Sequence, residues 1–120
     1  MKIVITSSGK SLESQIDSRF GRAAQFTVYD TETGEFQFVE NNQNLNAAQG
    51  AGIQAAEAVS RIGADCVITG HCGPKAFRTL QAAGIQIITG AQGTVSYVIE
   101  EFKAGRLKTS DSPDVEGHWA

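Results

Sequence analysis

The chain has 120 residues, of which 41% are hydrophobic and 19% are charged, and its formal net charge is −3. This composition predicts one folded domain with a sizeable core and excludes a disordered or fibrous chain. No uncharged apolar run approaches the roughly 20 residues of a membrane helix, and the apolar start is too short for a signal peptide. We therefore expect a cytoplasmic protein that contacts neither a membrane nor, given its net negative charge, nucleic acid.

Apolar and turn-forming residues follow a pattern that predicts five strands and three helices. Alternation of apolar and polar residues indicates strands, and the spacing of Val95, Val98 and Ile99 indicates a packed helix. A long loop over residues 7–21 should follow the first strand. In chain order we expect strands over residues 2–6, 25–30 and 35–40, a helix over 47–62, a strand over 65–69, a helix over 74–83, a strand over 85–89 and a helix over 95–104.

The order of these elements predicts an α/β fold. Strands joined through helices should run parallel, so the first, fourth and fifth strands should be neighbours in that order. The hairpin over residues 25–40 should extend the sheet beyond the first strand, which gives a mixed five-stranded sheet with helices on both faces. Ligands of such sheets bind outside the carboxyl ends of the parallel strands, which here carry the loops 7–21, 70–74 and 90–94.

Charged residues are unevenly spread along the chain. Residues 66–99 contain two basic residues and no Asp or Glu. Such a stretch in an acidic protein suits an anionic ligand, although a buried stretch also carries few charges. In the first loop, Arg19 and Arg22 could clamp an anion, or a salt bridge with Asp17 could simply order the loop.

Cys72 is the residue whose position says most about chemistry. It precedes Gly73 and Pro74 and should lie at a helix N-terminus, where the helix dipole favours a thiolate. A thiolate is a nucleophile, a soft-metal ligand or a redox group, although a small inert residue also fits a tight loop. The adjacent His71 could ligate a metal, pair with the thiol or cap a backbone carbonyl. Cys66 should be a core residue of the fourth strand, so Cys72 should react much faster with a thiol reagent.

Few residues offer acid–base catalysis. The sequence has no Ser-His-acid set in plausible positions, and the first strand holds no carboxylate. A nuclease on a similar sheet needs acids on its central strands to hold two metal ions. Gly90 and Gly93 precede the last helix and could offer backbone N–H groups to an anion. We therefore expect a binding protein rather than an enzyme.

A recognisable pattern is carried by segments 2–5 (KIVI), 17–23 (DSRFGRA), 26–30 (FTVYD), 50–56 (GAGIQAA), 70–76 (GHCGPKA) and 84–107. In these segments and their order the chain resembles the dinitrogenase iron–molybdenum cofactor biosynthesis family, the NifX-like and NifB-C-terminal-like domains. The resemblance covers residues 1–108, expected to form a single domain, and leaves 109–120 as a C-terminal tail. It implies a ribonuclease H-like three-layer fold with strand order 3-2-1-4-5.

The resemblance also implies a function, that of a small carrier or scaffold for an iron–sulfur or molybdenum-containing cluster. A related branch, the orange proteins of sulfate-reducing bacteria, carries a molybdenum–copper sulfide cluster. Such clusters are anionic, which fits the acid-free stretch. The implied partners are the metal cluster and other cluster-assembly proteins. Two other functions stay open: a metal-free regulatory or protein-interaction module, and a thiol redox enzyme that uses Cys72.

We expect the cluster to lie between the three loops. Arg19, Arg22 and Lys75 would neutralise its charge, and His71 and Cys72 are candidate metal ligands or hydrogen-bond donors. The full set of expected binding residues is Ser8, Arg19, Arg22, Gly70, His71, Cys72, Gly73, Lys75, Gly90 and Gly93.

Overall fold

The computed structural model describes residues 1–41 and 51–110, and these ranges contain five strands and three helices. None of these helices is long and apolar enough to cross a membrane. The predicted elements agree with the observed ones to within one residue, except that the predicted helix start at residue 47 lies outside the described ranges. The elements are β1 (Lys2–Ser7), β2 (Gln25–Asp30), β3 (Phe36–Glu40), α2 (Ala51–Ile62), β4 (Cys66–Ile68), α3 (Pro74–Ala82), β5 (Gln86–Ile88) and α4 (Val95–Lys103).

All five strands form one mixed sheet in the order β3-β2-β1-β4-β5. β1 pairs with β4 in parallel, and β4 pairs with β5 in parallel. The hairpin of β2 and β3 lies on the other side of β1 with antiparallel pairing. The predicted strand neighbours and their directions are therefore confirmed. As a consequence, the carboxyl ends of β1, β4 and β5 lie along one edge of the sheet.

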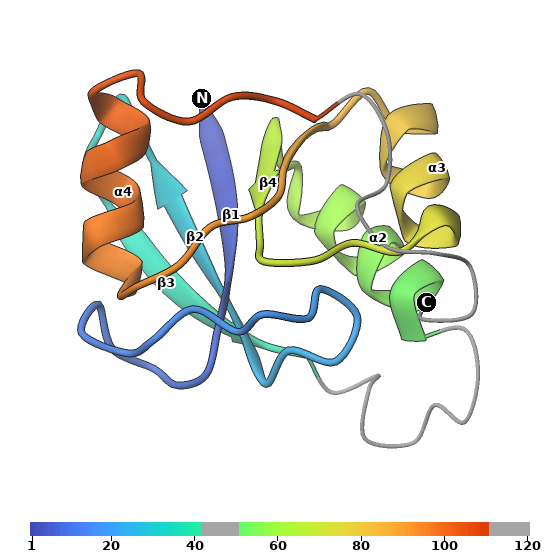
Figure 1. Ribbon diagram of the computed structural model, residues 1–120, viewed down its shortest axis with the longest axis horizontal. Helices are drawn as coiled ribbons and strands as arrows, with labels where there is room; N and C mark the ends of the chain where they lie inside the picture. The colour runs from blue at the N-terminus through green and yellow to red at the C-terminus, as the bar shows by residue number, and fades with distance from the viewer. Residues whose placement is uncertain (42–50, 111–120) are drawn as a thin grey trace.

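Helices cover both faces of the sheet because the central strand β1 is apolar on both. On one face, Val4 belongs to a buried cluster with Val59 of α2 and Phe77 of α3. On the other face, Ile3 and Ile5 belong to a second cluster that includes the buried side of α4. Figure 1 shows the resulting layers, with α4 on one side of the sheet and α2 and α3 on the other. The predicted arrangement of helices is confirmed.

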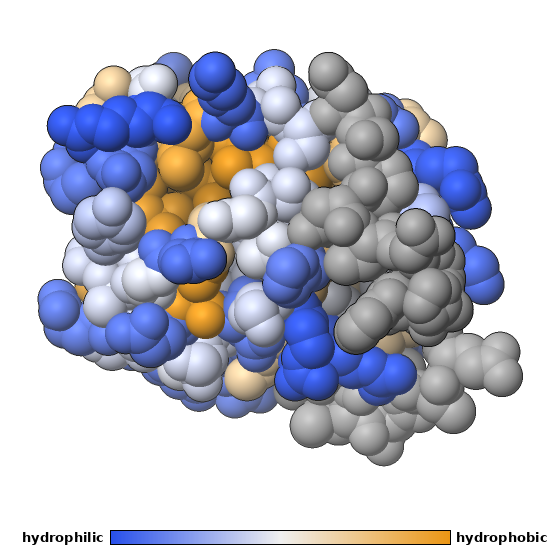
Figure 2. Space-filling view, viewed as in Figure 1, coloured by the Kyte–Doolittle hydropathy of each residue, from blue (hydrophilic) through white to orange (hydrophobic). Residues whose placement is uncertain are grey.

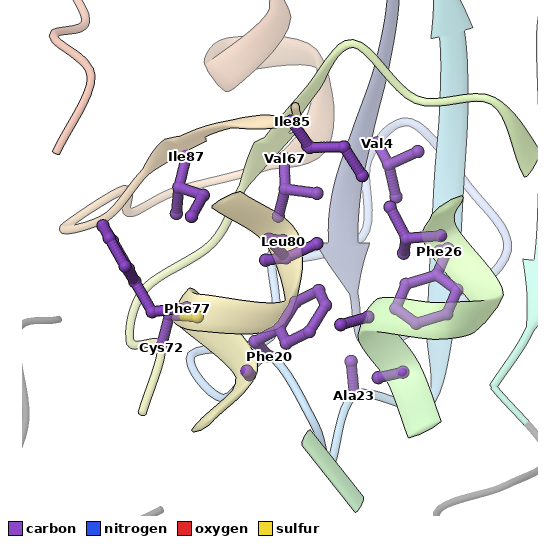
Figure 3. Close-up of a cluster of buried hydrophobic side chains, with 14 of the residues drawn as sticks. Val4, Phe20, Ala23, Phe26, Val67, Cys72, Phe77, Leu80, Ile85 and Ile87 are labelled. Carbon is purple, nitrogen blue, oxygen red and sulfur yellow. The ribbon is translucent and has the colours of Figure 1, made fainter. Parts of the chain in front are cut away.

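The cluster under α2 and α3 also holds the first loop in place (Figure 3). Phe20 comes from this loop, is only 2% exposed, and lies with its ring centroid 6.2 Å from that of Phe26. A buried aromatic ring contributes a large apolar area to the core, so the loop is anchored at this point. The anchor fixes where the neighbouring Arg19 and Gly21 leave the core.

The segment after α4 returns to the edge of the sheet. The Ser110 N–H donates to the Ile87 carbonyl at 2.7 Å, and the Ser110 and Thr89 hydroxyls lie 2.8 Å apart. The predicted tail over residues 109–120 therefore begins bound beside β5. The rest of the predicted tail, residues 111–120, lies outside the described ranges.

Candidate functional site

Three loops meet at the carboxyl edge of β1, β4 and β5, as the sequence predicts. Backbone hydrogen bonds join the first loop to the second: the Phe20 N–H donates to the His71 carbonyl at 3.1 Å, and the His71 N–H donates to the Ser18 carbonyl at 2.7 Å. The second loop joins the third through the Gly90 N–H and the Gly70 carbonyl, 2.8 Å apart. In Figure 1 the first loop, in blue, crosses below the strand ends, next to the green-yellow segment that leads into α3.

Gly70 is required by this close contact. A Cβ at this position would lie 2.7 Å from the Ser18 carbonyl oxygen and 2.8 Å from the Ser18 Cα, closer than real Cβ contacts. Beneath the contact, the buried hydroxyls of Thr6 and Thr69 lie 2.9 Å apart and connect the ends of β1 and β4. Sequence reasoning missed this hydroxyl pair, although each Thr ends an apolar strand on the same edge.

Several exposed basic side chains lie on these loops or at the start of α3. Arg19 and His71 are partners in a parallel β-bridge and both are exposed. Lys75 and Arg22 are also exposed. Arg19 Nε lies 4.0 Å from Asp17 Oδ1, which is at the limit of an ion pair, and the Arg19 side chain is 66% exposed. The bridge therefore brings an arginine and a histidine side by side at the mouth of the three loops.

Helix α3 begins at this same place, with Gly73 as its N-cap and Pro74 in its first turn. Within the described chain no side chain caps the start of α3, whereas Thr94 caps α4 by accepting the Tyr97 N–H at 3.1 Å. The N-terminus of a helix carries the positive end of the helix dipole. Because Lys75 follows in the first turn, this end of α3 favours an anion.

The Cys72 side chain lies elsewhere than we expected from the sequence. It is only 1% exposed and belongs to the buried cluster with Phe77 and Leu80 (Figure 3). Cys66 is fully buried, as predicted, and belongs to the cluster on the other face of the sheet. The expected ready access of Cys72 to a thiol reagent is therefore wrong, because the chain turns inward between His71 and Gly73.

Both thiols should be protected in the folded protein. We expect a disulfide reagent to modify Cys66 and Cys72 slowly under native conditions and to modify both rapidly in denaturant. Mass spectrometry of the two cysteine-containing peptides over a time course measures each rate separately. Rapid native modification of Cys72 alone would contradict its burial.

The remaining expected residues serve mainly to shape the loops. The Ser8 hydroxyl donates to the Gln15 carbonyl at 2.9 Å, within the first loop. Gly90 and Gly93 have φ values of +81° and +102°, in the left-handed region that glycine adopts without strain. The N–H of Gly90 is already bonded to Gly70, so it does not face a ligand as the sequence suggested.

A shallow apolar hollow lies on the α4 face, between that helix and the third loop (Figure 2). Its volume of about 230 Å³ is below the roughly 300–1,000 Å³ of pockets that enclose small ligands. At its rim the Tyr97 hydroxyl donates to Glu101 at 3.1 Å, which raises the pKa of Tyr97. Glu101 is also paired with Arg106. Tyr97, Glu101 and Arg106 thus pair with one another at the rim of the hollow.

The donor set of the three loops distinguishes between kinds of ligand. Within residues 1–41 and 51–110, no three His, Cys, Asp or Glu side chains gather as a metal site needs. An anion finds exposed Arg19, His71 and Lys75 beside the uncapped start of α3. The described residues of the three loops therefore suit a preformed anionic group better than a bare metal ion.

The fold and these loops define a class of protein, a small α/β domain that presents exposed basic side chains at the carboxyl edge of its sheet. The chain matches the family model described as dinitrogenase iron–molybdenum cofactor over residues 1–105. It belongs to this family, as the resemblance of its sequence motifs indicates.

Relatives of known structure share the whole fold. The orange protein from Desulfovibrio gigas, solved in its apo form, is 37% identical, with a TM-score of 0.92 over 95% of this chain and 96% of that one. A putative NifB protein from Thermotoga is 34% identical, with a TM-score of 0.80 over 95% and 98% of the two chains. A further relative is matched by sequence: an uncharacterized protein of Methanocaldococcus jannaschii is 26% identical over 97 residues, 79% of this chain and 82% of that one.

Proposed function

We propose that this protein binds and carries an anionic metal–sulfur cluster that contains iron, molybdenum, or molybdenum with copper. The observation that carries the proposal is the pairing of exposed Arg19 and His71 beside the uncapped, Lys75-bearing start of α3. Membership of a family named for the iron–molybdenum cofactor, and the likeness to the orange protein, support a cluster over other anions.

The cationic side chains have a direct role in this proposal. Arg19 and Lys75 compensate the negative charge of the cluster, and the Arg19 guanidinium offers a planar set of donors to sulfide or oxo atoms. His71 is a candidate metal ligand or hydrogen-bond donor, and Arg22 lies nearby along the first loop. Because these side chains are exposed, a cluster held mainly by charge can be handed to another cluster-assembly protein without unfolding the domain.

Cys72 is the weaker candidate ligand. Its side chain packs in the core, so ligation requires the loop at residues 70–73 to open toward solvent. The same burial disfavours the thiol redox enzyme, because a reactive thiolate needs access to its substrate. We therefore propose that the cluster is retained without Cys72.

We propose the ribonuclease H-like relationship for the fold, supported by the strand order β3-β2-β1-β4-β5.

The composition of the central strands favours a carrier over a catalyst. Neither β1 nor β4 contains an Asp or Glu, so these two central strands lack the acids that would hold the metal ions of a two-metal nuclease. Two free cysteines suit a reducing compartment, which supports a cytoplasmic carrier.

A titration with tetrathiomolybdate under anaerobic conditions tests the proposal. We expect saturable binding, seen as a change in the visible spectrum, that weakens as salt concentration rises because salt screens exposed charges. Arg19→Ala and Lys75→Ala should each weaken binding by about 5-fold or more, since each removes a charge-assisted contact. Cys72→Ala should bind as the wild type does.

Lys103→Ala provides the matched control. Lys103 is an exposed lysine at the far end of α4, paired with Glu100, so its loss changes net charge by the same amount as Lys75→Ala. Equal weakening in the two lysine variants would show a general charge effect and remove the proposed site. Loss of binding in Cys72→Ala, with the fold intact by circular dichroism, would instead make that thiol a ligand.

A further inference from the structure

We propose that Asp17 is a positioning residue for the anion site, because it fixes the backbone of Arg19 where the guanidinium can meet the ligand. This inference rests on the proposed function. It concerns a carboxylate, the group that an anion site would ordinarily exclude. A negative charge beside a bound anion costs affinity, so its presence there requires a compensating contribution.

The backbone of Asp17 is held from below by the end of β1. Its N–H donates to the Thr6 carbonyl at 2.9 Å, and its carbonyl accepts the Thr6 hydroxyl at 2.8 Å. The Thr6 hydroxyl also lies 2.9 Å from that of Thr69. Asp17 is thus fixed to the strand ends of β1 and β4, and its side chain is only 16% exposed.

The carboxylate of Asp17 accepts a hydrogen bond from the residue two positions further along the chain. Its Oδ1 accepts the Arg19 N–H at 3.0 Å, which closes an Asx turn. The contact with the Arg19 guanidinium is much longer, at 4.0 Å to Nε. Beyond the turn, Phe20 enters the core and its N–H bonds to His71. The short hydrogen bond therefore sets the backbone of Arg19, while the long ion pair leaves its side chain available.

Two substitutions separate this positioning role from the charge of Asp17. Asp17→Asn keeps an oxygen that can accept the Arg19 N–H but removes the negative charge. Asp17→Ala removes both. If Asp17 positions Arg19, Asp17→Ala should weaken tetrathiomolybdate binding by about 5-fold or more, because the turn is lost. Asp17→Asn should bind as tightly as the wild type or more tightly, because only the repulsive charge is gone.

The experiment compares the wild type with both variants by anaerobic tetrathiomolybdate titration, with amide hydrogen exchange of Arg19 and Phe20 measured in the unliganded protein. We expect faster exchange in Asp17→Ala and near wild-type exchange in Asp17→Asn. Wild-type affinity in Asp17→Ala overturns the inference. Equal weakening in both variants also overturns it, because the loss of affinity would then follow the removal of the carboxylate charge and not the loss of the turn. Failure of the wild type to bind overturns the proposed function, and the positioning role with it.

Discussion

Between pH 9 and 12 the folded protein should lose up to about 4 kcal/mol of stability through one buried thiol. Cys66 is fully buried in β4, and this burial, together with the nearby charge of Asp65, raises the pKa of the thiol from 9.0 to about 12. The unfolded chain has no such burial, so its thiol ionises near the ordinary pKa. Above that pH the unfolded state binds fewer protons than the folded state, and stability falls.

Urea denaturation of the wild type and of Cys66→Ala at pH 8, 9, 10 and 11 measures this effect. Below about pH 9 the difference in unfolding free energy between the two proteins should be constant and should reflect packing alone. At higher pH the wild type should lose stability faster than Cys66→Ala, by about 1.4 kcal/mol for each pH unit. Curves that stay parallel from pH 8 to 11 would show that the thiol is not protected as the structure indicates.

Gly70→Ala should separate the first two loops and weaken both the fold and the ligand site. The added Cβ would meet the backbone of Ser18 at 2.7 and 2.8 Å, and backbone cannot move aside as a flexible side chain can. Overpacking of this kind costs about 1–3 kcal/mol. Because Ser18 precedes Arg19, the displaced loop should also lower affinity for tetrathiomolybdate.

Gly9→Ala is the control within the same loop. Its Cβ would meet the Ser14 hydroxyl at 2.8 Å, but that hydroxyl is the end of a side chain that can rotate away. Thermal unfolding and tetrathiomolybdate titration of both variants should show a large change only for Gly70→Ala. Wild-type stability in Gly70→Ala would mean that the contact between the loops is looser than described.

Much of the fold follows from the sequence because hydrophobic periodicity and connection rules act on whole segments. The apolar run at β1 predicts a central strand, and the single helix between β4 and β5 predicts that these two strands pair in parallel. The parallel pairing in turn places the loops after β1, β4 and β5 at one edge. The approximate location of the site could therefore be predicted before any side chain was placed.

The details of the site depend on which way single residues turn, and periodicity does not determine that. Cys72 and His71 are adjacent, yet one packs beneath Phe77 and the other is exposed. Gly90 precedes a helix but donates its N–H to Gly70. The Asp17 carboxylate closes a turn by accepting the Arg19 N–H, and the Thr6 hydroxyl donates to the Asp17 carbonyl. These outcomes depend on individual contacts, such as the burial of Cys72 in the core and the bond between Gly90 and Gly70.

Elemental analysis with a visible spectrum, on protein purified and kept under anaerobic conditions, tests the central claim most directly. If the three loops carry an anionic metal–sulfur cluster, the protein should contain iron, molybdenum or copper together with sulfide, and should absorb visible light. A colourless protein with none of these metals, which also takes up none after incubation with iron and sulfide or with tetrathiomolybdate and copper, would contradict the claim. That result would favour a metal-free interaction module.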